Sequence, residues 1–294
     1  MIPSAFEYAS PRSVPEAIAL LRNRGDGAKV LAGGQSLIPL LKLRLASPTV
    51  VIDINGIPGL DYIKENGGFL KIGALVRMAD VEASDLLLRK YPVIHDASEV
   101  IADPLVRNLG TVGGNLSHGD PANDLPAVML ALGGKLVATG PSGDRVIPAE
   151  SFFVDSFTTA LNHDEILTEV RVPVPGPRSG GAYLKHELKV GDFATAGVAV
   201  QVGLGPKGEC KSVGIGLTGV GPTAIKARAA EEALIGRRPG DGDAVRAAAK
   251  LAAESADPAS DIRGTAQYKR DVVALLFRRG VQMASDRARP GGAG

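Results

Sequence analysis

Two short glycine-rich segments that lie far apart in the sequence constrain this chain more than any other feature. The first, residues 32–36 (AGGQS), lies between a buried-strand pattern and an apolar helix pattern; the second, residues 110–115 (GTVGGN), lies in a stretch that we expect to be a loop. Glycine lets a ligand approach the backbone without meeting a Cβ, and the unpaired N–H groups before a helix attract a phosphate. Two such segments in one fold can hold a diphosphate from both sides, which favours a dinucleotide cofactor over a mononucleotide.

The spacing of these glycines excludes two familiar phosphate-binding motifs. No further glycine follows Gly34 at the interval of a Rossmann motif, and the chain contains no Gly-Lys-Ser/Thr of a P-loop. A second interpretation stays open for each segment taken alone. Because the chain has 37 glycines, Gly-Gly pairs also occur by chance in ordinary turns.

The charge balance and the cysteine count exclude several classes of function. Lys and Arg number 33 against 32 Asp and Glu, so we expect no nucleic-acid partner. The single cysteine, Cys210, cannot supply the four thiolates of a [2Fe–2S] cluster, and the four histidines show no metal-site spacing. We therefore expect no metal to be bound by this chain.

The chain shows no targeting segment. Its N-terminus lacks a basic stretch followed by an apolar one, and no run of about 18 apolar residues could cross a bilayer. We expect a cytoplasmic protein without a transmembrane segment, and peripheral attachment to a membrane through a partner stays open.

Hydrophobic periodicity and the positions of glycine and proline predict an α+β fold with two domains. We expect a first domain over 1–177, made of a small βαβ subdomain (about 1–55) and a mixed α/β subdomain (56–177), and a C-terminal α+β domain over 178–288. The linker at 173–181 contains three prolines and three glycines. Residues 289–294 are expected to be a disordered tail.

The helix and strand patterns are specific enough to be tested. Helices are predicted at 15–22, with a cap near Ser13, and at 37–45, 78–89, 93–101, 122–132, 223–235, 244–255 and 265–284. Strands are predicted at 29–31, 50–54, 69–72, 135–138 and 169–172, and residues 107–121 are predicted to be a long loop. The C-terminal domain is predicted to hold a three-stranded antiparallel sheet, with strands at 182–189, 197–204 and 211–218.

Three stretches carry a resemblance to a known family. They are AGGQSLIPLLKLRLASPTVVIDIN, IADPLVRNLGTVGGNLSHGDPANDLPAVMLALG and LKHELKVGDFATAGVAV. In this order they resemble the FAD-binding medium subunit of aerobic carbon monoxide dehydrogenase, within the wider xanthine dehydrogenase family of molybdenum hydroxylases, and the resemblance covers nearly the whole chain. It implies a FAD-binding domain of the vanillyl-alcohol-oxidase (PCMH) type, followed by a C-terminal domain of the carbon monoxide dehydrogenase flavoprotein type.

The resemblance also implies which residues hold FAD. By position they are Ala32, Gly33, Gly34, Gln35, Ser36, Leu37, Ile101, Thr111, Val112, Gly113, Gly114, Asn115, Asp124, Leu167, Lys185 and Phe193. Asp124 matches an aspartate that hydrogen-bonds the cofactor, although it could equally be an acidic residue that stabilises a helix dipole. Lys185 matches a lysine near the isoalloxazine, where a cation favours the anionic reduced flavin and raises its potential; without the resemblance it would be a solvated strand lysine.

Other matched positions are less informative or depart from the family. Ile101 and Leu167 match apolar positions around the flavin, and on the sequence alone each would be a core residue. Gln35 stands where relatives often have histidine, and Phe193 where they often have tyrosine, so both departures weaken a specific carbon monoxide assignment and leave FAD binding intact. We interpret His118 as a loop histidine near the cofactor or a partner, and expect no catalytic residue in this chain.

The function that the resemblance implies is electron transfer. FAD would receive electrons from [2Fe–2S] clusters on a small subunit, after a large molybdopterin-binding subunit has oxidised the substrate, and would pass them to an external acceptor. The expected assembly is a dimer of heterotrimers. Two alternatives stay open: the flavin subunit of a related hydroxylase acting on an aldehyde, an N-heterocycle (nicotine or a purine) or an aromatic acyl-CoA, and a non-redox assembly subunit with an empty flavin site.

Overall fold

The N-terminal part of the chain is a small parallel sheet with a helix packed on it. The computed structural model describes residues 2–289. The strands lie in the order β1 (Glu7–Ala9), β3 (Val50–Asp53) and β2 (Ala28–Leu31). Helix α1 (Val14–Arg24) begins after Ser13, whose hydroxyl accepts the N–H of Glu16, and a short 3-10 turn, η1 (Gly25–Gly27), leads into β2. The chain then passes through residues 32–36 into α2 (Leu37–Lys42) and returns as β3, which confirms the predicted βαβ unit.

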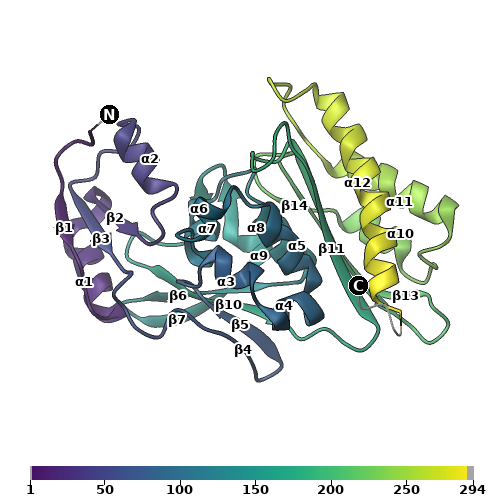
Figure 1. Ribbon diagram of the computed structural model, residues 1–294, viewed down its shortest axis with the longest axis horizontal. Coiled ribbons are helices and arrows are strands. Elements are labelled where there is room, and N and C mark those ends of the chain that lie inside the picture. Colours follow the sequence, from purple (N-terminus) through teal and green to yellow (C-terminus); the bar gives the residue numbers. More distant parts are fainter. Residues whose placement is uncertain (1, 290–294) are drawn as a thin grey trace.

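The central part is built on a five-stranded antiparallel sheet, above which α6, α7 and α8 lie in Figure 1. The strand order is β4 (Ile63–Asn66), β5 (Phe69–Gly73), β10 (Ile166–Pro173), β6 (Lys135–Gly140) and β7 (Gly143–Pro148). The helices are α3 (Met78–Glu82), α4 (Asp85–Lys90), α5 (Pro92–Val100), α6 (Pro104–Arg107), α7 (Val112–His118), α8 (Asp124–Ala131) and α9 (Ala149–Phe152). A small hairpin, β8 (Phe153–Asp155) and β9 (Thr158–Thr159), follows α9.

The C-terminal part is a four-stranded antiparallel sheet with three helices beside it (Figure 1). The strands lie in the order β11 (Ser179–His186), β12 (Ala196–Leu204), β13 (Cys210–Thr218) and β14 (Ile225–Lys226). The helices are α10 (Arg228–Leu234), α11 (Gly242–Ser255) and α12 (Ala266–Arg287). As predicted, β12 and β13 are antiparallel neighbours.

Helices cover both faces of this C-terminal sheet, because glycines in its strands let helix backbones approach closely. A Cβ at Gly216 would lie 2.0 Å from the carbonyl oxygen of Ala127 on α8, and a Cβ at Gly180 would lie 2.1 Å from that of Ala284 on α12. Helix α8 of the central part therefore packs directly on the C-terminal sheet. The first residue of α8, Asp124, is thereby held next to strand β11, which carries Tyr183.

Several sequence predictions were wrong in detail. The helix predicted at 78–89 is two helices, because the Ser84 hydroxyl accepts the N–H of Leu87 and begins α4. The loop predicted at 107–121 contains α7, and the sheet predicted to have three strands has four, because residues 225–226 pair with β13 as β14 instead of starting a helix at Thr223. Of the expected tail, residues 290–294 lie outside the described residues.

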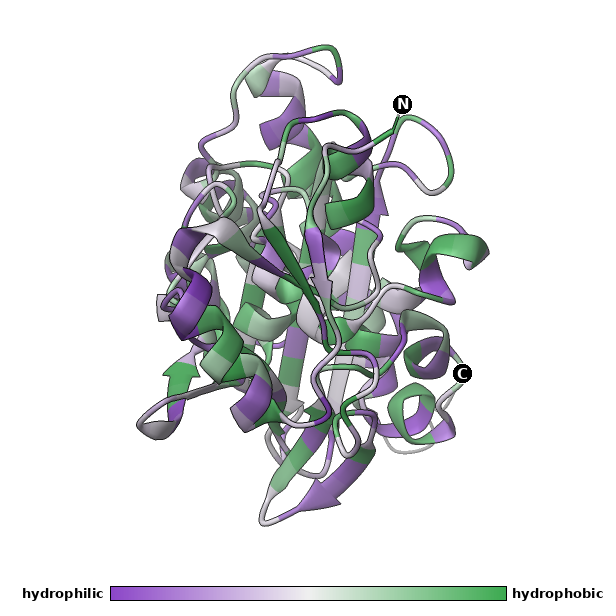
Figure 2. Ribbon diagram, turned by 90° about the vertical axis from the view of Figure 1, so that its left-hand side faces the viewer, coloured by the Kyte–Doolittle hydropathy of each residue, from purple (hydrophilic) through white to green (hydrophobic). Residues whose placement is uncertain are grey.

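No helix within residues 2–289 combines the length and the apolar character that a bilayer crossing requires. Figure 2 shows hydrophilic and hydrophobic residues mixed over the helices and strands.

Candidate cofactor site

The two glycine-rich segments are in direct backbone contact. A Cβ at Gly33 would lie 2.2 Å from the carbonyl oxygen of Leu109 and 2.8 Å from the Cα of Gly110, so only glycine fits there. Gly34 has a φ of +75°, a conformation that side chains with a Cβ rarely adopt. Ala32 lies next to Gly114, where an added Cβ would be 4.0 Å from the Ala32 Cβ. The segments therefore form one continuous surface, as their composition suggested.

The first segment offers unpaired backbone donors. Among the hydrogen bonds of residues 2–289, none uses the N–H groups of residues 33–36 as donors. The segment leads into α2, and the hydroxyl of Ser36 at the start of this helix makes no capping hydrogen bond. These donors suit a phosphate, because backbone N–H groups bind oxyanions where a strand turns into a helix.

The second segment differs from the expected loop, because it is the start of α7. Thr111 is the N-cap, and its hydroxyl accepts the N–H of Gly114 at 3.0 Å. The N–H of Gly113 donates to Ala74, and that of Asn115 donates to Thr111. The expected cradle of backbone donors is therefore present on the first segment only. The second segment offers its side chains, together with the small surface of its glycines.

A buried polar atom of the second segment lacks a partner among the described residues. The side-chain oxygen Oδ1 of Asn115 is buried and accepts no hydrogen bond. Such an atom is costly unless a donor reaches it. A flavin dinucleotide carries ribityl and ribose hydroxyl donors as well as a diphosphate. Asn115 and the unpaired donors of residues 33–36 therefore fit this cofactor.

A second cluster lies around Lys185, whose side chain is only 2% exposed. Its Nζ donates to the carbonyl oxygen of Val100 at 2.5 Å and to that of Asp192 at 3.0 Å. The same Nζ lies 3.4 Å from Asp124 Oδ2 and 3.1 Å from Glu187 Oε2. Lys185 is thus a buried cation that joins three segments, and is not a solvated strand lysine.

This cluster brings together several of the residues that the family resemblance selects. Lys185 binds the carbonyl oxygens of Val100 and Asp192, the residues just before Ile101 and Phe193. Through these contacts it holds the Ile101 and Phe193 segments close to Asp124. Phe193 is 49% exposed. Ile101 and Leu167 are 7% and 3% exposed and belong to the main hydrophobic core.

Burial controls the protonation of Asp124. Desolvation raises the pKa of this carboxyl from 3.8 to about 6, against the opposing effects of the Lys185 charge and the Tyr183 hydroxyl. Tyr183 donates to Asp124 Oδ1 at 2.5 Å, and burial beside this carboxylate raises the pKa of Tyr183 well above its usual value. Asp124 is also the first residue of α8, so its two sequence interpretations are compatible.

One hydrogen bond connects the glycine segments to the Lys185 cluster. The side-chain amide Nδ2 of Asn123 donates to the carbonyl oxygen of Asn115 at 2.8 Å. Asn123 immediately precedes Asp124, so the end of the second segment lies beside the buried carboxyl. The candidate site therefore extends from Gly33 to Lys185.

Four residues that the sequence did not single out support this site. Arg107 is 8% exposed, pairs with Glu82 at 2.7 Å and donates to the carbonyl oxygens of Ile101 and Ala102. Arg263 donates to Asp192 Oδ1 at 3.0 Å. Asn55 and Arg77 lie between the two glycine segments. The contacts by which the four support the site carry no local sequence signal, because each goes to a remote side chain or to a backbone carbonyl.

His118 shows no arrangement typical of a catalytic base. Burial lowers its pKa, and its ring lies 5.3 Å from the ring of Phe157. No hydrogen bond joins the His118 ring to another side chain among the described residues. His118 is the last residue of helix α7, with Gly119 as the C-cap, so the expected position in a loop was wrong.

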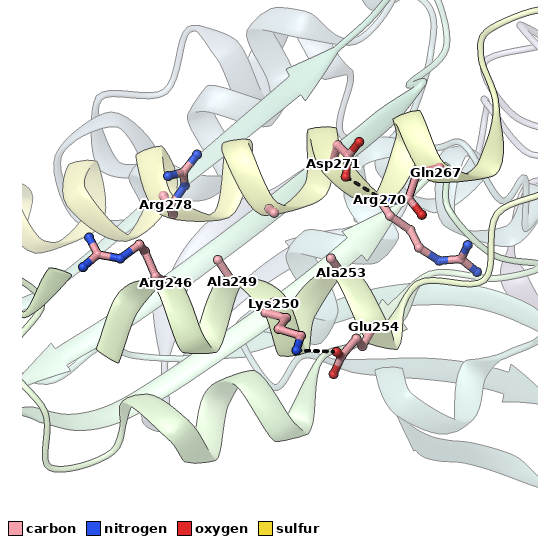
Figure 3. Close-up of a pocket in the computed structure, with 10 residues that line it drawn as sticks. Arg246, Ala249, Lys250, Ala253, Glu254, Gln267, Arg270, Asp271 and Arg278 are labelled. Atoms are coloured by element: carbon pink, nitrogen blue, oxygen red, sulfur yellow. Dashed lines mark hydrogen bonds and ion pairs between the residues drawn. The ribbon is translucent and has the colours of Figure 1, made fainter. Parts of the chain in front are cut away.

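Figure 3 shows a groove between α11 and α12, which none of the site residues lines. It has a volume of about 470 Å³, and only residues of these two helices line it. Three of its four lining cations have acidic partners: Lys250 lies 3.7 Å from Glu254, Arg246 pairs with Asp243, and Arg270 lies 4.0 Å from Asp257. We interpret it as a solvated groove between helices.

Comparison with known proteins places the whole chain in one family. The model of the FAD binding domain in molybdopterin dehydrogenase matches residues 4–175, and that of the CO dehydrogenase flavoprotein C-terminal domain matches residues 181–284. The carbon monoxide dehydrogenase medium chain of Afipia carboxidovorans is 42% identical, over 98% of this chain and 100% of the relative. Subunit alpha of the 6-hydroxypseudooxynicotine dehydrogenase complex of Paenarthrobacter nicotinovorans is 38% identical, over 99% and 98%. A chain in the structure of carbon monoxide dehydrogenase from Hydrogenophaga pseudoflava superposes with a TM-score of 0.94, at 44% identity, over 98% and 99%.

Proposed function

The chain belongs to the family of FAD-binding flavoprotein subunits of molybdopterin dehydrogenases, and from that premise we propose that it holds one FAD along the line from Gly33 to Lys185. The observation that carries this placement is the backbone contact of the two glycine segments beside the unpaired donors of residues 33–36. We place the domain boundary at 177/178, between the end of β10 at Pro173 and the start of β11 at Ser179.

The residues of this chain bind and orient; none performs acid–base chemistry on a substrate. The N–H groups of residues 33–36 would hold the diphosphate, and the side chains of Thr111 and Asn115 would add polar contacts to the cofactor. Bound FAD supplies the redox chemistry, since a flavin exchanges electrons both singly and in pairs. Lys185 and Asp124 would set the charge beside the ring.

The most strongly supported enzyme is an aerobic carbon monoxide dehydrogenase. Medium chains of this enzyme from Afipia carboxidovorans and Hydrogenophaga pseudoflava are both 42% identical to this chain. A related hydroxylase is the second candidate, because the subunit from the 6-hydroxypseudooxynicotine dehydrogenase complex is 38% identical over nearly the same length. Gln35 and Phe193 also support this second candidate, because both depart from the residues that are common in carbon monoxide dehydrogenase-like relatives.

The proposed partners follow from what this chain lacks. Its single cysteine cannot ligate a [2Fe–2S] cluster, so we assign the clusters to a small subunit and the molybdopterin cofactor to a large one. We propose a cytoplasmic dimer of heterotrimers. The alternative of an assembly subunit without cofactor is disfavoured, because it gives no role to the buried oxygen of Asn115 or to the unpaired donors of residues 33–36.

The test is to purify the complex from its native host, denature it, and identify the released nucleotide by chromatography and mass spectrometry. We expect one FAD per copy of this chain, together with a large and a small companion subunit. A complex that contains no FAD, and does not take it up, would favour the assembly subunit. Assays of the same preparation with carbon monoxide, nicotine, purines and aldehydes separate the two enzyme candidates.

A further inference from the structure

We infer that Asn55 and Arg77 form a clamp that holds the two glycine segments together and so positions them for the FAD diphosphate; this inference rests on the proposed function. Asn55 Nδ2 donates to the carbonyl oxygen of Ala32 at 2.7 Å. Arg77 Nη1 donates to the carbonyl oxygen of Leu109 at 2.6 Å, and Arg77 Nη2 donates to Asn55 Oδ1 at 2.7 Å. The chain of contacts therefore runs from one segment to the other through two side chains.

The clamp acts at the point where the segments touch. Ala32 immediately precedes Gly33, and the carbonyl oxygen of Leu109 is the atom against which Gly33 packs. Both carbonyl oxygens carry partial negative charge close to the proposed diphosphate. Donors from Asn55 and Arg77 occupy them, and the guanidinium adds a positive charge that an anion favours.

Each member of the clamp is fixed to a different part of the fold. Asp53 Oδ1 accepts both the backbone N–H of Asn55, at 2.9 Å, and its Nδ2, at 2.6 Å. Asp53 Oδ2 accepts the hydroxyl of Tyr8 at 2.7 Å. Asn55 therefore lies just after β3 of the small parallel sheet. Its amide orientation is defined because Nδ2 donates to Ala32 and Asp53, and Oδ1 accepts from Arg77.

The backbone at Arg77 pairs with the second glycine segment. Residues 77 and 111 form an isolated antiparallel β-bridge, and the N–H of Met78 donates to the carbonyl oxygen of Gly110 at 2.9 Å. The contact between Arg77 and Asn55 is therefore the tie between the small sheet and the central part at this site. Gln35 Nε2 and the carbonyl oxygen of Leu105 add only a long contact of 3.5 Å.

Fixing both segments in advance would favour binding, because a cofactor then does not spend binding free energy on ordering them. Lysine at position 77 should be a poor substitute. Its single ammonium cannot reproduce the planar fork with which arginine reaches Leu109 and Asn55 together. The structure therefore predicts that geometry matters at this position as well as charge.

The experiment uses the native complex carrying R77M, R77K or N55A in this chain. The matched control is R145M, because Arg145 on β7 likewise donates to a side-chain oxygen, here on the Glu165 carboxylate, and to a backbone carbonyl, that of Ala160. FAD content after gel filtration, FAD affinity, and the thermal midpoint before and after addition of excess FAD are measured. The increase in midpoint on adding FAD reports cofactor binding, whereas a purely structural defect lowers both midpoints equally.

We expect R77M and N55A to weaken FAD affinity about tenfold or more, which corresponds to a loss of about 1.4 kcal/mol or more of binding free energy. R77K should weaken it by about threefold or more, and R145M should leave it unchanged. The increase in midpoint on adding FAD should shrink in the same order. Wild-type affinity in R77M, R77K and N55A, or equal shifts of both midpoints, would overturn the clamp. A wild-type complex that does not bind FAD would instead overturn the proposed function.

Discussion

Gly33 packs so closely on Leu109 that a Cβ on the glycine would lie 2.2 Å from the leucine carbonyl oxygen. The contact joins the turn after β2 to the turn before α7, which belong to different parts of the fold. Glycine at position 33 is therefore required by the protein itself, before any ligand is considered. The same contact creates the surface at which we place the cofactor diphosphate.

Replacing Gly33 with alanine should separate the two segments. The added methyl group meets backbone atoms, which cannot move as a flexible side chain would, so we expect a cost of about 1–3 kcal/mol in stability. FAD retention in the complex should fall about tenfold or more. Gly176 provides the control, because a Cβ there meets nothing within 4 Å. Unchanged flavin content in the G33A complex would show that the contact does not shape the site.

The buried carboxyl of Asp124 should give the complex a characteristic pH dependence. Its pKa is raised from 3.8 to about 6, so the folded protein binds this proton more tightly than the unfolded chain does. Stability from this group therefore increases as the pH falls from about 6 towards 3.8, and it is lost as the pH rises through 6. Lys185, Tyr183 and Glu187 are the charged and titratable groups that face it.

The D124N variant isolates this effect from other carboxylates. The thermal midpoint of the wild-type complex, relative to that of D124N, should fall as the pH rises from about 4 to about 7 and level off above that range. A difference between the two that does not vary with pH would contradict the assignment.

Removing the cation at Lys185 should be costly. The K185M variant leaves the buried carboxylate of Asp124 and the partly buried one of Glu187 without their counter-charge, for which we expect a loss of about 3–5 kcal/mol. If the variant complex still holds FAD, the flavin potential should fall, because a positive charge beside the ring is gone. Lys189, an exposed lysine of the same hairpin, gives the matched control. A potential equal to that of K189M would exclude the proposed tuning role.

Arg287 at the end of α12 should stabilise the contact between the two domains. It donates to both carboxylate oxygens of Asp96 on α5, at 2.6 and 3.0 Å, and to the carbonyl oxygen of Gly181. Because both side chains are largely buried, R287M should cost about 2 kcal/mol, measured as a lower thermal midpoint. The exposed pair of Arg89 and Asp85 gives a control whose loss should cost less than about 0.5 kcal/mol. An equal decrease of the thermal midpoint in R287M and R89M would contradict the stabilising role of the Arg287–Asp96 pair.

Local patterns predicted much of this fold. Ser13 before an apolar repeat marks the start of α1, and the β-branched run at 50–53 marks β3. Glycines in the first segment also indicated an unusual turn, and Gly34 has the positive φ that such a turn requires. These features depend on neighbours within a few residues, so the sequence carries them directly.

Other features depend on partners that the sequence does not reveal. Gly113 and Gly114 suggested a loop, yet the cap at Thr111 and the burial of Val112 and Leu116 offset the low helix propensity of glycine. Strand β14 exists only because β13 lies beside it. The same is true of the site: the contacts of Arg77 with Asn55, and of Lys185 with Asp124, join elements that become neighbours only after folding.

The most direct test of the account is a cryo-electron microscopy map of the native complex at a resolution that shows individual phosphates. We predict density for the two phosphates of one FAD against residues 33–36 and the start of α7, with Asn55 and Arg77 bridging the segments behind it. Density for the cofactor elsewhere on the chain, or glycine segments that lie apart in the complex, would contradict the proposal.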